Sequence, residues 1–270
     1  MRYLFVAIGS MLLLGLSVWV IAPAPTRWLL TFAVGAPEVS PWLIVGNLVF
    51  LSLGLLTARQ SGLGWATVAV SCLALILTAY PLSQFHAANQ AANQALAQVM
   101  GENYPVTVAP TLNTKLRSQP FVLADSFRGI ATAPVRETTG IPFAQPDGVP
   151  LTLTLYQPAQ ADTYPAIVMI YGGSWQTGSP RDNATFARYM ANQGYVVWAI
   201  SYRHAPEYQF PAQIEDVRAA LEFLKDHAGE YDTDANRVAL LGRSAGAHLA
   251  MLAAYQPGPL PIRAVVDYYG

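Results

Sequence analysis

A serine with a glycine two residues away on each side stands in Gly242-Arg243-Ser244-Ala245-Gly246, a G-x-S-x-G pattern. The apolar run VALL before it predicts a buried strand, and the run AGAHLAMLAAY after it predicts a helix. A sharp strand-to-helix turn exposes the serine hydroxyl, and flanking glycines relieve crowding around a strained backbone. The hydroxyl then lies at a helix N-terminus, where partial positive charge favours an oxyanion. In this context the pattern favours Ser244 as a nucleophile over a purely structural turn.

A second glycine-rich segment, Tyr171-Gly172-Gly173-Ser174-Trp175, follows the apolar run AIVMIY directly. Two glycines let the backbone fold back, so that its N–H groups can point at a substrate oxygen as an oxyanion hole. A plain glycine turn is the alternative. Because this segment and the serine pattern occur in one domain and in this order, the functional interpretation is favoured.

The elements that must hold these two motifs follow from the pattern of apolar residues between positions 134 and 270. Strands are predicted at 152–156, 166–171, 195–201, 237–241 and 263–268, and helices at 182–193, 211–226 and 245–255. The turn Pro146-Asp147-Gly148 before the alternating TLTLY indicates an antiparallel hairpin. Strand–helix alternation predicts an α/β domain with a mostly parallel sheet, whose sites lie at the C-terminal ends of the strands.

These residues resemble a known family. The segments YGGSW, SYRHAPEYQFPAQIED and GRSAG, in this order, are similar to the α/β-hydrolase fold and to its small esterases related to hormone-sensitive lipase and kynurenine formamidase. That branch reads HGG-x-W, YR-x-AP…FP…D and G-x-SAG. The resemblance covers residues 134–270 and implies Ser244 as nucleophile, with the N–H groups of Gly172, Gly173 and Ala245 as oxyanion donors and no metal or organic cofactor. Tyr171 stands where the family has a histidine that is usually structural, so this departure concerns the geometry of the loop.

A serine nucleophile at neutral pH needs a general base, normally a histidine held by a carboxylate. In this fold the order along the chain is serine, acid, histidine. After Ser244 the sequence offers only His248 and then Asp267, which is the reverse order. His248 lies one helical turn behind the serine, where its ring faces neighbouring turns, and neither His204 nor His227 is placed to act as the base. The sequence therefore assigns no catalytic acid or base.

The last predicted strand, at 263–268, leaves the sheet with an apolar edge, and natural domains seldom end on such an edge. Two further strands of the resembled fold are not present. We therefore expect this sequence to be the first part of a longer protein, with the acid and the histidine beyond Gly270. A finished pseudoenzyme is the alternative.

The first third of the chain predicts a membrane region. Three apolar segments, near 3–22, 42–58 and 63–80, are long enough to cross a bilayer as helices, and Trp or Tyr residues mark their ends. Residues 1–82 are therefore expected to form about three transmembrane helices. The first segment could instead be a cleaved signal peptide, but Pro25 makes the site near 22–24 a poor cleavage context, which favours an uncleaved helix.

Positive charge near these segments predicts an orientation. Arg2 and the amino terminus precede the first segment, Arg59 lies between the second and third, and Arg27 is alone in the first loop. The positive-inside rule then puts the N-terminus in the cytoplasm and the α/β domain on the extracytoplasmic side. Residues 83–133 are expected to connect the two parts: an Ala- and Gln-rich helix over 83–101, then a linker over 102–133.

Composition excludes several classes of protein. Only 11% of the 270 residues are charged, against roughly 25% in an average soluble domain, and the net charge is −1. Without a basic run, nucleic-acid binding is not expected. The 53% hydrophobic content excludes disorder of the bulk, and a single cysteine, Cys72, excludes an intrachain disulfide or a cysteine metal site.

The sequence thus predicts a membrane-anchored serine hydrolase, of the carboxylesterase or lipase type, that cleaves carboxylic esters or small amides through an acyl-enzyme on Ser244. Its expected partners are a small-molecule ester or amide substrate and the lipid bilayer. The alternative is a non-catalytic binding module that keeps the pocket and lacks the histidine and acid. A transport function is disfavoured because no ionisable residue lies inside a predicted span.

Overall fold

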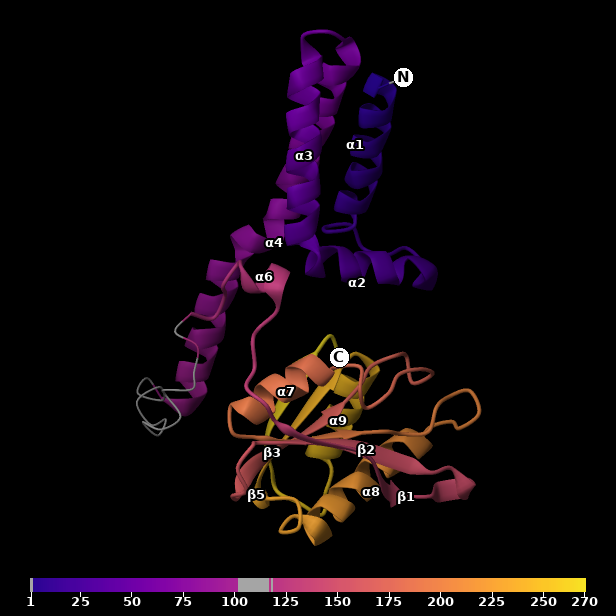
Figure 1. Cartoon of the computed structure of the whole chain (residues 1–270). Coiled ribbons are helices and arrows are strands. Elements are labelled where there is room, and N and C mark those ends of the chain that lie inside the picture. The colour runs from indigo at the N-terminus through magenta and orange to yellow at the C-terminus, as the bar shows by residue number, and fades with distance from the viewer. Residues whose placement is uncertain (1, 102–116, 118) are drawn as a thin grey trace. The chain divides into compact units, whose positions relative to one another are not determined.

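The computed structural model describes residues 2–101, 117 and 119–270, and it divides into two compact units, Met1–Gly129 and Ile130–Gly270 (Figure 1). The division lies four residues before the boundary that the sequence predicts. Much of the predicted linker, 102–116 and 118, is outside the described residues.

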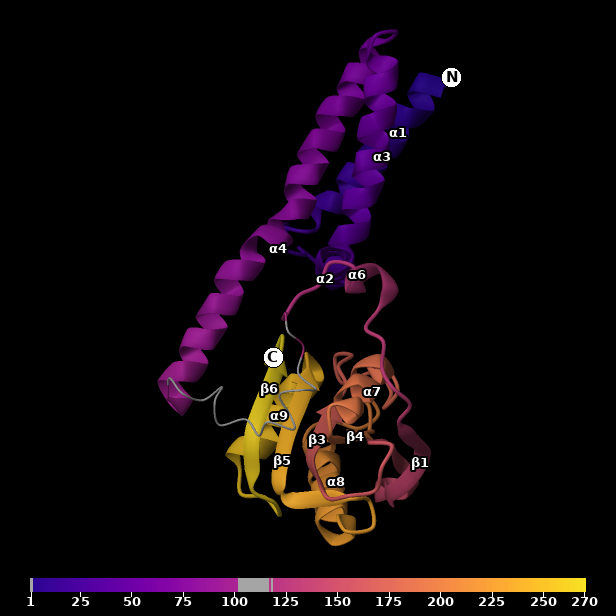
Figure 2. The same ribbon diagram turned by 60° about the vertical axis from the view of Figure 1, so that its left-hand side comes forward.

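The first unit is helical throughout its described elements. They are α1 (Arg2–Val18), the 3₁₀ turn η1 (Arg27–Leu29), α2 (Leu30–Glu38), α3 (Ser40–Ala58), α4 (Gly62–Met100) and the short α6 (Asp125–Arg128). Helices α1, α3 and the first part of α4 run side by side (Figures 1 and 2). By length and composition, α3 and α4 could each cross a membrane, and only 28% of the residues in their most apolar stretches are buried.

Two predicted spans differ from the observed helices. The first, expected over 3–22, ends at Val18, and the following residues form a turn because Pro23 and Pro25 cannot continue a helix. The third span and the connector helix, expected as separate elements, form the single 39-residue α4. Pro81 lies inside α4, where the Ser83 hydroxyl donates to the Tyr80 carbonyl at 2.7 Å, and the Ala- and Gln-rich sequence carries the helix on to Met100. Neither α2 nor α6 was predicted.

In the helical unit, polar side chains are among the most buried, and many large apolar side chains are exposed. Fully or almost fully buried polar residues are Ser10, Ser17, Ser40, Asn47, Thr67, Ser71 and Thr78. Small residues allow close helix contact: a Cβ on Gly54 of α3 would lie 3.0 Å from the Thr67 methyl carbon of α4. Large exposed apolar side chains include Phe5, Leu12, Leu56, Trp65 and Ile76. This distribution is the reverse of that in a water-soluble domain.

The second unit is built on one six-stranded sheet with the order β1-β2-β4-β3-β5-β6. The strands are β1 (Arg136–Ala144), β2 (Leu151–Gln157), β3 (Tyr164–Ile170), β4 (Val196–Ile200), β5 (Thr233–Arg243) and β6 (Ile262–Tyr268), and the helices are α7 (Ala184–Asn192), α8 (Ala212–His227) and α9 (Ala245–Tyr255). Strands β4, β3, β5 and β6 are parallel, whereas β1 and β2 are antiparallel to their neighbours. This mostly parallel sheet fits the α/β-hydrolase fold.

Every strand and helix predicted in this unit is present, with ends that shift by a few residues, and β1 is the hairpin partner of β2. Strand β2 is buried more completely than its alternating sequence suggests. Thr154 is only 3% exposed, because β2 is paired on both edges and contacts α7. The apolar periodicity of the sequence is thus sufficient to locate the elements that carry both motifs.

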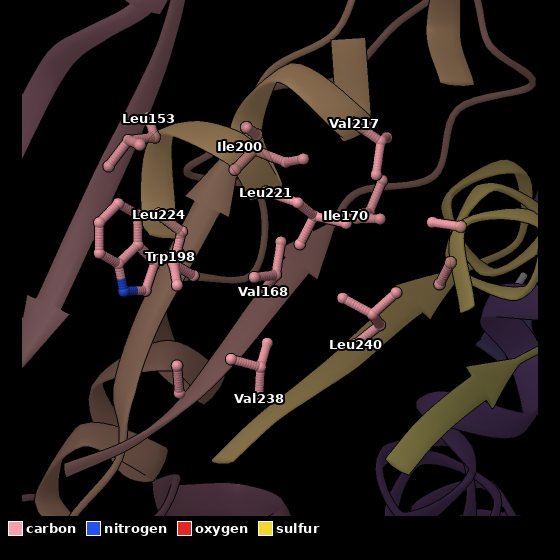
Figure 3. Packing of buried hydrophobic residues seen from close by; sticks show 14 of the residues in the cluster. Leu153, Val168, Ile170, Trp198, Ile200, Val217, Leu221, Leu224, Val238 and Leu240 are labelled. Carbon is pink, nitrogen blue, oxygen red and sulfur yellow. The ribbon is translucent and has the colours of Figure 1, made fainter. Parts of the chain in front are cut away.

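Helices cover both faces of the sheet. On one face, Val168 and Trp198 pack against Val217 and Leu221 of α8, and α9 adds Leu249 to the same cluster (Figure 3). On the other face, Ala187 and Ala191 of α7 pack with a second cluster that includes Ile167, Met169 and Val197. Burial of each large apolar side chain stabilises the fold by about 1.5–3 kcal/mol. The resulting three-layer core holds the strand ends on which the site lies.

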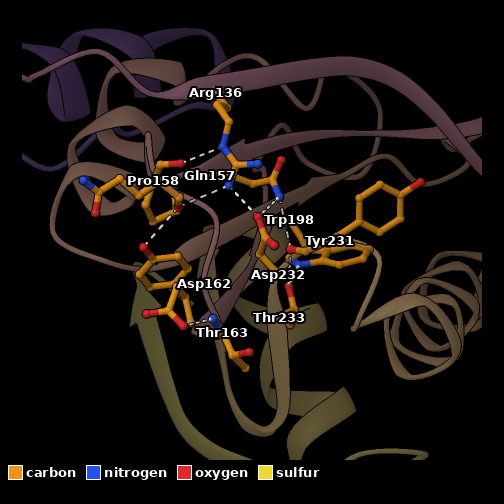
Figure 4. Close-up of polar contacts among 11 residues, drawn as sticks. Arg136, Gln157, Pro158, Asp162, Thr163, Trp198, Tyr231, Asp232 and Thr233 are labelled. Atoms are coloured by element: carbon orange, nitrogen blue, oxygen red, sulfur yellow. Dashed lines mark hydrogen bonds and ion pairs between the residues drawn. The ribbon is translucent and has the colours of Figure 1, made fainter.

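Polar contacts tie the hairpin to the segment before β5 (Figure 4). Arg136 pairs with Asp232 at 2.5 Å, and the Gln157 amide donates to the same carboxylate at 3.1 Å. The buried Trp198 indole donates to the Thr233 hydroxyl at 3.1 Å. These contacts give hydrogen-bond partners to polar groups at the edge of the core. Without partners, such groups would destabilise the fold.

Candidate active site

Ser244 occupies a strained turn between β5 and α9. Its φ is +53° and its ψ is −122°, a backbone conformation that residues other than glycine rarely adopt. The Ser244 N–H donates to the Tyr268 carbonyl at 2.7 Å, and its side chain is exposed. Such strain persists only where the surrounding structure enforces it, and it is concentrated at functional sites.

The glycines on either side of the serine are required by close backbone approach. A Cβ on Gly246 would lie 2.2 Å from the Ile170 carbonyl oxygen at the end of β3, and one on Gly242 would lie 2.2 Å from the Gly246 oxygen. Any side chain at either position would push α9 away from the sheet. The G-x-S-x-G spacing is therefore explained by the packing that forces Ser244 outward.

The loop after β3 lies directly beside this turn. A Cβ on Gly172 would be 3.2 Å from the Ser244 Cβ, and Gly173 has a φ of +128°. Within the described residues, the N–H groups of Gly172, Gly173 and Ala245 donate to no protein acceptor. Three unpaired donors therefore lie on the two segments that meet at Ser244. Donors in such an arrangement can stabilise negative charge on an oxygen at the serine.

A polar pocket of about 230 Å³ opens at this junction, and its lining residues are Gly172, Gly173, Asp182, Asn183, Arg243 and Ser244. The Asp182 carboxylate accepts hydrogen bonds from the N–H and the hydroxyl of Ser179. The Arg243 guanidinium lies 5.8 Å from the centre of the Tyr269 ring. The pocket thus exposes the serine to solvent beside groups of both charges.

Tyr171 is the first residue of the loop after β3, and it stands where the resembled family has histidine. Its ring stacks on Tyr202 with 4.5 Å between ring centres, and its hydroxyl lies 2.9 Å from the His204 Nε2. The Tyr202 hydroxyl donates to the Tyr171 carbonyl at 3.1 Å. Burial raises the pKa of Tyr171 to about 12, raises the pKa of Tyr202 and lowers that of His204. Tyr171 is therefore a buried structural residue, and the sequence alone did not reveal its contact with His204.

A buried ion pair positions the segment between β4 and α8. Arg203 is 6% exposed and makes several hydrogen bonds to Asp216, itself 1% exposed, and a further one to Asp147 at 2.5 Å. The carboxylates and the charge-assisted hydrogen bonds raise the pKa of Arg203. The sequence pattern YR…D contains this pair, but spacing gave no reason to expect it to be buried.

Four of the predicted site residues, Ser244, Gly172, Gly173 and Ala245, are thus brought together. No histidine among the described residues is hydrogen-bonded to the Ser244 hydroxyl. In the second unit, His204 contacts Tyr171, His227 stacks on Phe223, and His248 lies edge-on to Trp175. The Asp267 carboxylate accepts the Gly270 N–H. The described residues also contain no group of three His, Cys, Asp or Glu that could hold a metal ion.

Comparison with known proteins gives consistent matches for the second unit. Residues 153–270 match the family model BD-FAE. A probable carboxylic ester hydrolase, LipM of Mycobacterium tuberculosis, is 38% identical over 120 residues, which is 40% of this chain and 28% of that protein. An arylesterase of Saccharolobus solfataricus is 30% identical over 123 residues, which is 45% of this chain and 40% of that protein.

Among solved structures, a thermophilic esterase of Thermogutta terrifontis is 32% identical, with a TM-score of 0.41, over 47% of this chain and 45% of that one. The chain spans well under half the length of the curated relatives named above. The matched segment contains Ser244, Gly172, Gly173 and Ala245. The chain is therefore similar in sequence, over about 120 residues, to carboxylic ester hydrolases.

Proposed function

We propose that the second unit hydrolyses carboxylic esters, with Ser244 as the nucleophile. The observation that carries the proposal is the strained, exposed Ser244 beside the three unpaired N–H groups of Gly172, Gly173 and Ala245. The similarity of this segment to ester hydrolases supports the reaction type. Small amides react by the same chemistry and are the second substrate class.

In the proposed reaction the Ser244 hydroxyl oxygen attacks the ester carbonyl carbon and gives up its proton. The carbonyl oxygen becomes an oxyanion, which the N–H groups of Gly172, Gly173 and Ala245 bind. The alcohol leaves with a proton, and water then hydrolyses the acyl-enzyme to regenerate the serine. The reaction requires a general base, and no described histidine contacts Ser244. That base is the part of the proposal with no assigned residue.

Ester hydrolysis by the purified protein, produced from its own gene, tests this proposal. We expect Ser244→Ala to lower kcat/KM for a short-chain ester by about 10⁴-fold or more, since the nucleophile is lost. Ser126→Ala, on α6 in the other unit, is the control and should leave kcat/KM unchanged. Full activity in the Ser244→Ala protein, or a folded protein that binds esters without turnover, would contradict the proposal.

We further propose that the helical unit anchors the protein in a lipid bilayer. Its buried Ser, Thr and Asn side chains and its exposed Phe, Leu and Ile side chains suit a hydrocarbon solvent, in which helix contacts rely on small and polar residues. The lengths of α3 and α4 also support this role. The charges of Arg2, the amino terminus and Arg59, against Arg27 alone, favour placement of the second unit on the extracytoplasmic side.

Membrane fractionation tests the anchor. We expect the full chain to remain with the membrane after alkaline carbonate extraction and to be released by detergent. Release by carbonate alone would show that the protein is only peripherally attached, and this would contradict the anchor.

A further inference from the structure

A second pocket, of about 340 Å³, lies close to the candidate active site and is almost entirely apolar. Its lining residues are Trp175, Ala205, Phe210, Gln213, His248 and Leu249, and we call it the Trp175 pocket. Its volume is at the lower end of the range of roughly 300–1,000 Å³ found for small-molecule sites. It can therefore hold a compact group rather than a long chain.

The Trp175 pocket shares two of its three segments, the loop after β3 and helix α9, with the turn that holds Ser244. Trp175 is two residues beyond Gly173 on the loop after β3, and His248 is four residues beyond Ser244 on α9. Four helical residues rise about 6 Å along the axis. A substituent attached to a carbonyl at Ser244 therefore needs only a few bonds to reach this pocket.

The walls of the pocket are held in place before any ligand binds. The Trp175 and His248 rings meet edge to face, with 5.6 Å between their centres. The Ala205 N–H donates to the Trp175 carbonyl at 2.8 Å, which joins the loop after β4 to the loop after β3. The neighbouring Arg203–Asp216 pair fixes the base of the same segment. A preformed pocket loses less free energy on binding than a flexible one.

Two polar side chains, Gln213 and His248, interrupt the apolar lining. Gln213 is only 3% exposed, and its amide nitrogen donates to the Tyr208 carbonyl at 2.7 Å. Its side-chain oxygen has no donor among the described residues. An acceptor without a protein donor can accept a hydrogen bond from a ligand that brings its own donor. Phe210, 69% exposed, stands at the rim, where its ring can cover a bound group.

We propose that the Trp175 pocket binds a compact, ring-sized apolar group of the ester substrate, attached either through the acyl or through the alcohol side. This inference rests on the proposed ester hydrolysis at Ser244. The pocket then sets specificity: substrates with such a group react faster than substrates with a methyl group in the same place.

Two pairs of esters test whether the pocket binds the acyl side or the alcohol side of the substrate. Methyl cyclohexanecarboxylate against methyl acetate tests the acyl side, and cyclohexyl acetate against methyl acetate tests the alcohol side. We expect a preference for the cyclohexyl compound in one pair, and about a tenfold loss of that preference in kcat/KM on Phe210→Ala. Phe210→Trp, which keeps an aromatic rim, should preserve it. Tyr255→Ala is the control, because Tyr255 is an exposed aromatic residue of α9 that lines neither pocket.

A binding measurement separates failure of this inference from failure of the proposed function. Cyclohexanecarboxamide, which carries both the ring and an N–H donor, is titrated into the Ser244→Ala protein and into Ser244→Ala combined with Phe210→Ala. Several-fold weaker binding in the double variant supports the pocket even if no ester is hydrolysed. Equal binding in both proteins, or ester preferences unchanged by Phe210→Ala in both pairs, would overturn the pocket while leaving hydrolysis at Ser244 intact.

Discussion

The two units of this chain bury opposite kinds of residue. In the sheet unit the core is made of Leu, Ile, Val and Trp, and its most buried charged pair, Arg203 with Asp216, is matched by several hydrogen bonds. In the helical unit the fully buried side chains are Ser, Thr and Asn together with Ala74, whereas many large apolar side chains face outward. The two units of one chain therefore follow different patterns of side-chain burial.

We propose that this contrast reflects the solvent around each unit, which is water for the sheet unit and lipid for the helical unit. Water favours burial of apolar area, so the sheet unit gains stability from its core. A bilayer offers no such gain between helices, so contacts there depend on small residues and hydrogen bonds, such as that from the Asn47 amide to the Ser17 hydroxyl at 3.2 Å. Four experiments test this comparison.

The largest effect is expected at the buried ion pair of the sheet unit. Asp216→Ala leaves the Arg203 guanidinium buried without its main partner, which costs about 3–5 kcal/mol of the free energy of unfolding. Asp147→Ala removes a partner that is 64% exposed, so it should cost less than about 1 kcal/mol. Urea denaturation of both variants measures the two costs. Equal losses of unfolding free energy in the two variants would contradict the burial of the Arg203–Asp216 pair.

A charge on the outer surface of the helical unit should be costly only within the bilayer. Leu73→Lys puts a cation on the exposed face of α4 inside its predicted span, at a cost of about 2.5–3.5 kcal/mol in lipid. Val99→Lys, on the same helix beyond that span and 87% exposed, should cost almost nothing. The fraction of chain retained after carbonate extraction should fall for Leu73→Lys alone. Unchanged retention of both variants would argue against lipid around Leu73.

High pH should weaken the sheet unit through Tyr171. Between pH 10 and pH 12 the unfolded chain loses the Tyr171 proton while the folded protein keeps it, so the unfolded state binds fewer protons and stability falls as pH rises. This difference in the Tyr171 pKa contributes about 2–3 kcal/mol to the free energy of unfolding, and that contribution is fully present below pH 10. Denaturation midpoints across this range should fall less steeply for Tyr171→Phe. A slope identical to the wild type would indicate that Tyr171 is not protected from ionisation.

The smallest effect is expected inside the helical unit. The Ser71 hydroxyl is buried without a hydrogen-bond partner among the described residues, so Ser71→Ala should stabilise the unit slightly, by about 0.5–1 kcal/mol. Ser10→Ala is the matched control and should destabilise the unit, because it removes the hydrogen bond that the Ser10 hydroxyl donates to the Ala7 carbonyl at 2.9 Å. Thermal unfolding in detergent measures both changes. Destabilisation by Ser71→Ala would indicate a partner for this hydroxyl, such as a bound water.

The sequence predicted most of what local patterns can encode. Apolar runs located β3, β4 and β5, and glycine spacing located the turn that exposes Ser244. The helix breaks were predicted less well: α4 continues through Pro81, because one proline in a long, strongly helical sequence need not end a helix. The catalytic assignment of Ser244 remains a proposal.

Contacts between distant residues could not be read from local patterns. The Tyr171 hydroxyl meets His204 across 33 positions, and the Trp175 pocket draws together residues from three segments. The burial of polar side chains in the helical unit was also missed, since Ser and Thr within apolar runs look like minor interruptions until helix packing gathers them. Spacing predicts elements, whereas tertiary structure decides which side chains meet.

The most direct test of the central claim is covalent labelling of Ser244. The protein produced from its own gene is treated with a fluorophosphonate, and the adduct is located by peptide mass spectrometry. We predict a single adduct on the peptide that contains Ser244, absent from Ser244→Ala and retained in Ser126→Ala. A folded protein whose Ser244 stays unlabelled, or an adduct that persists in Ser244→Ala, would contradict the account.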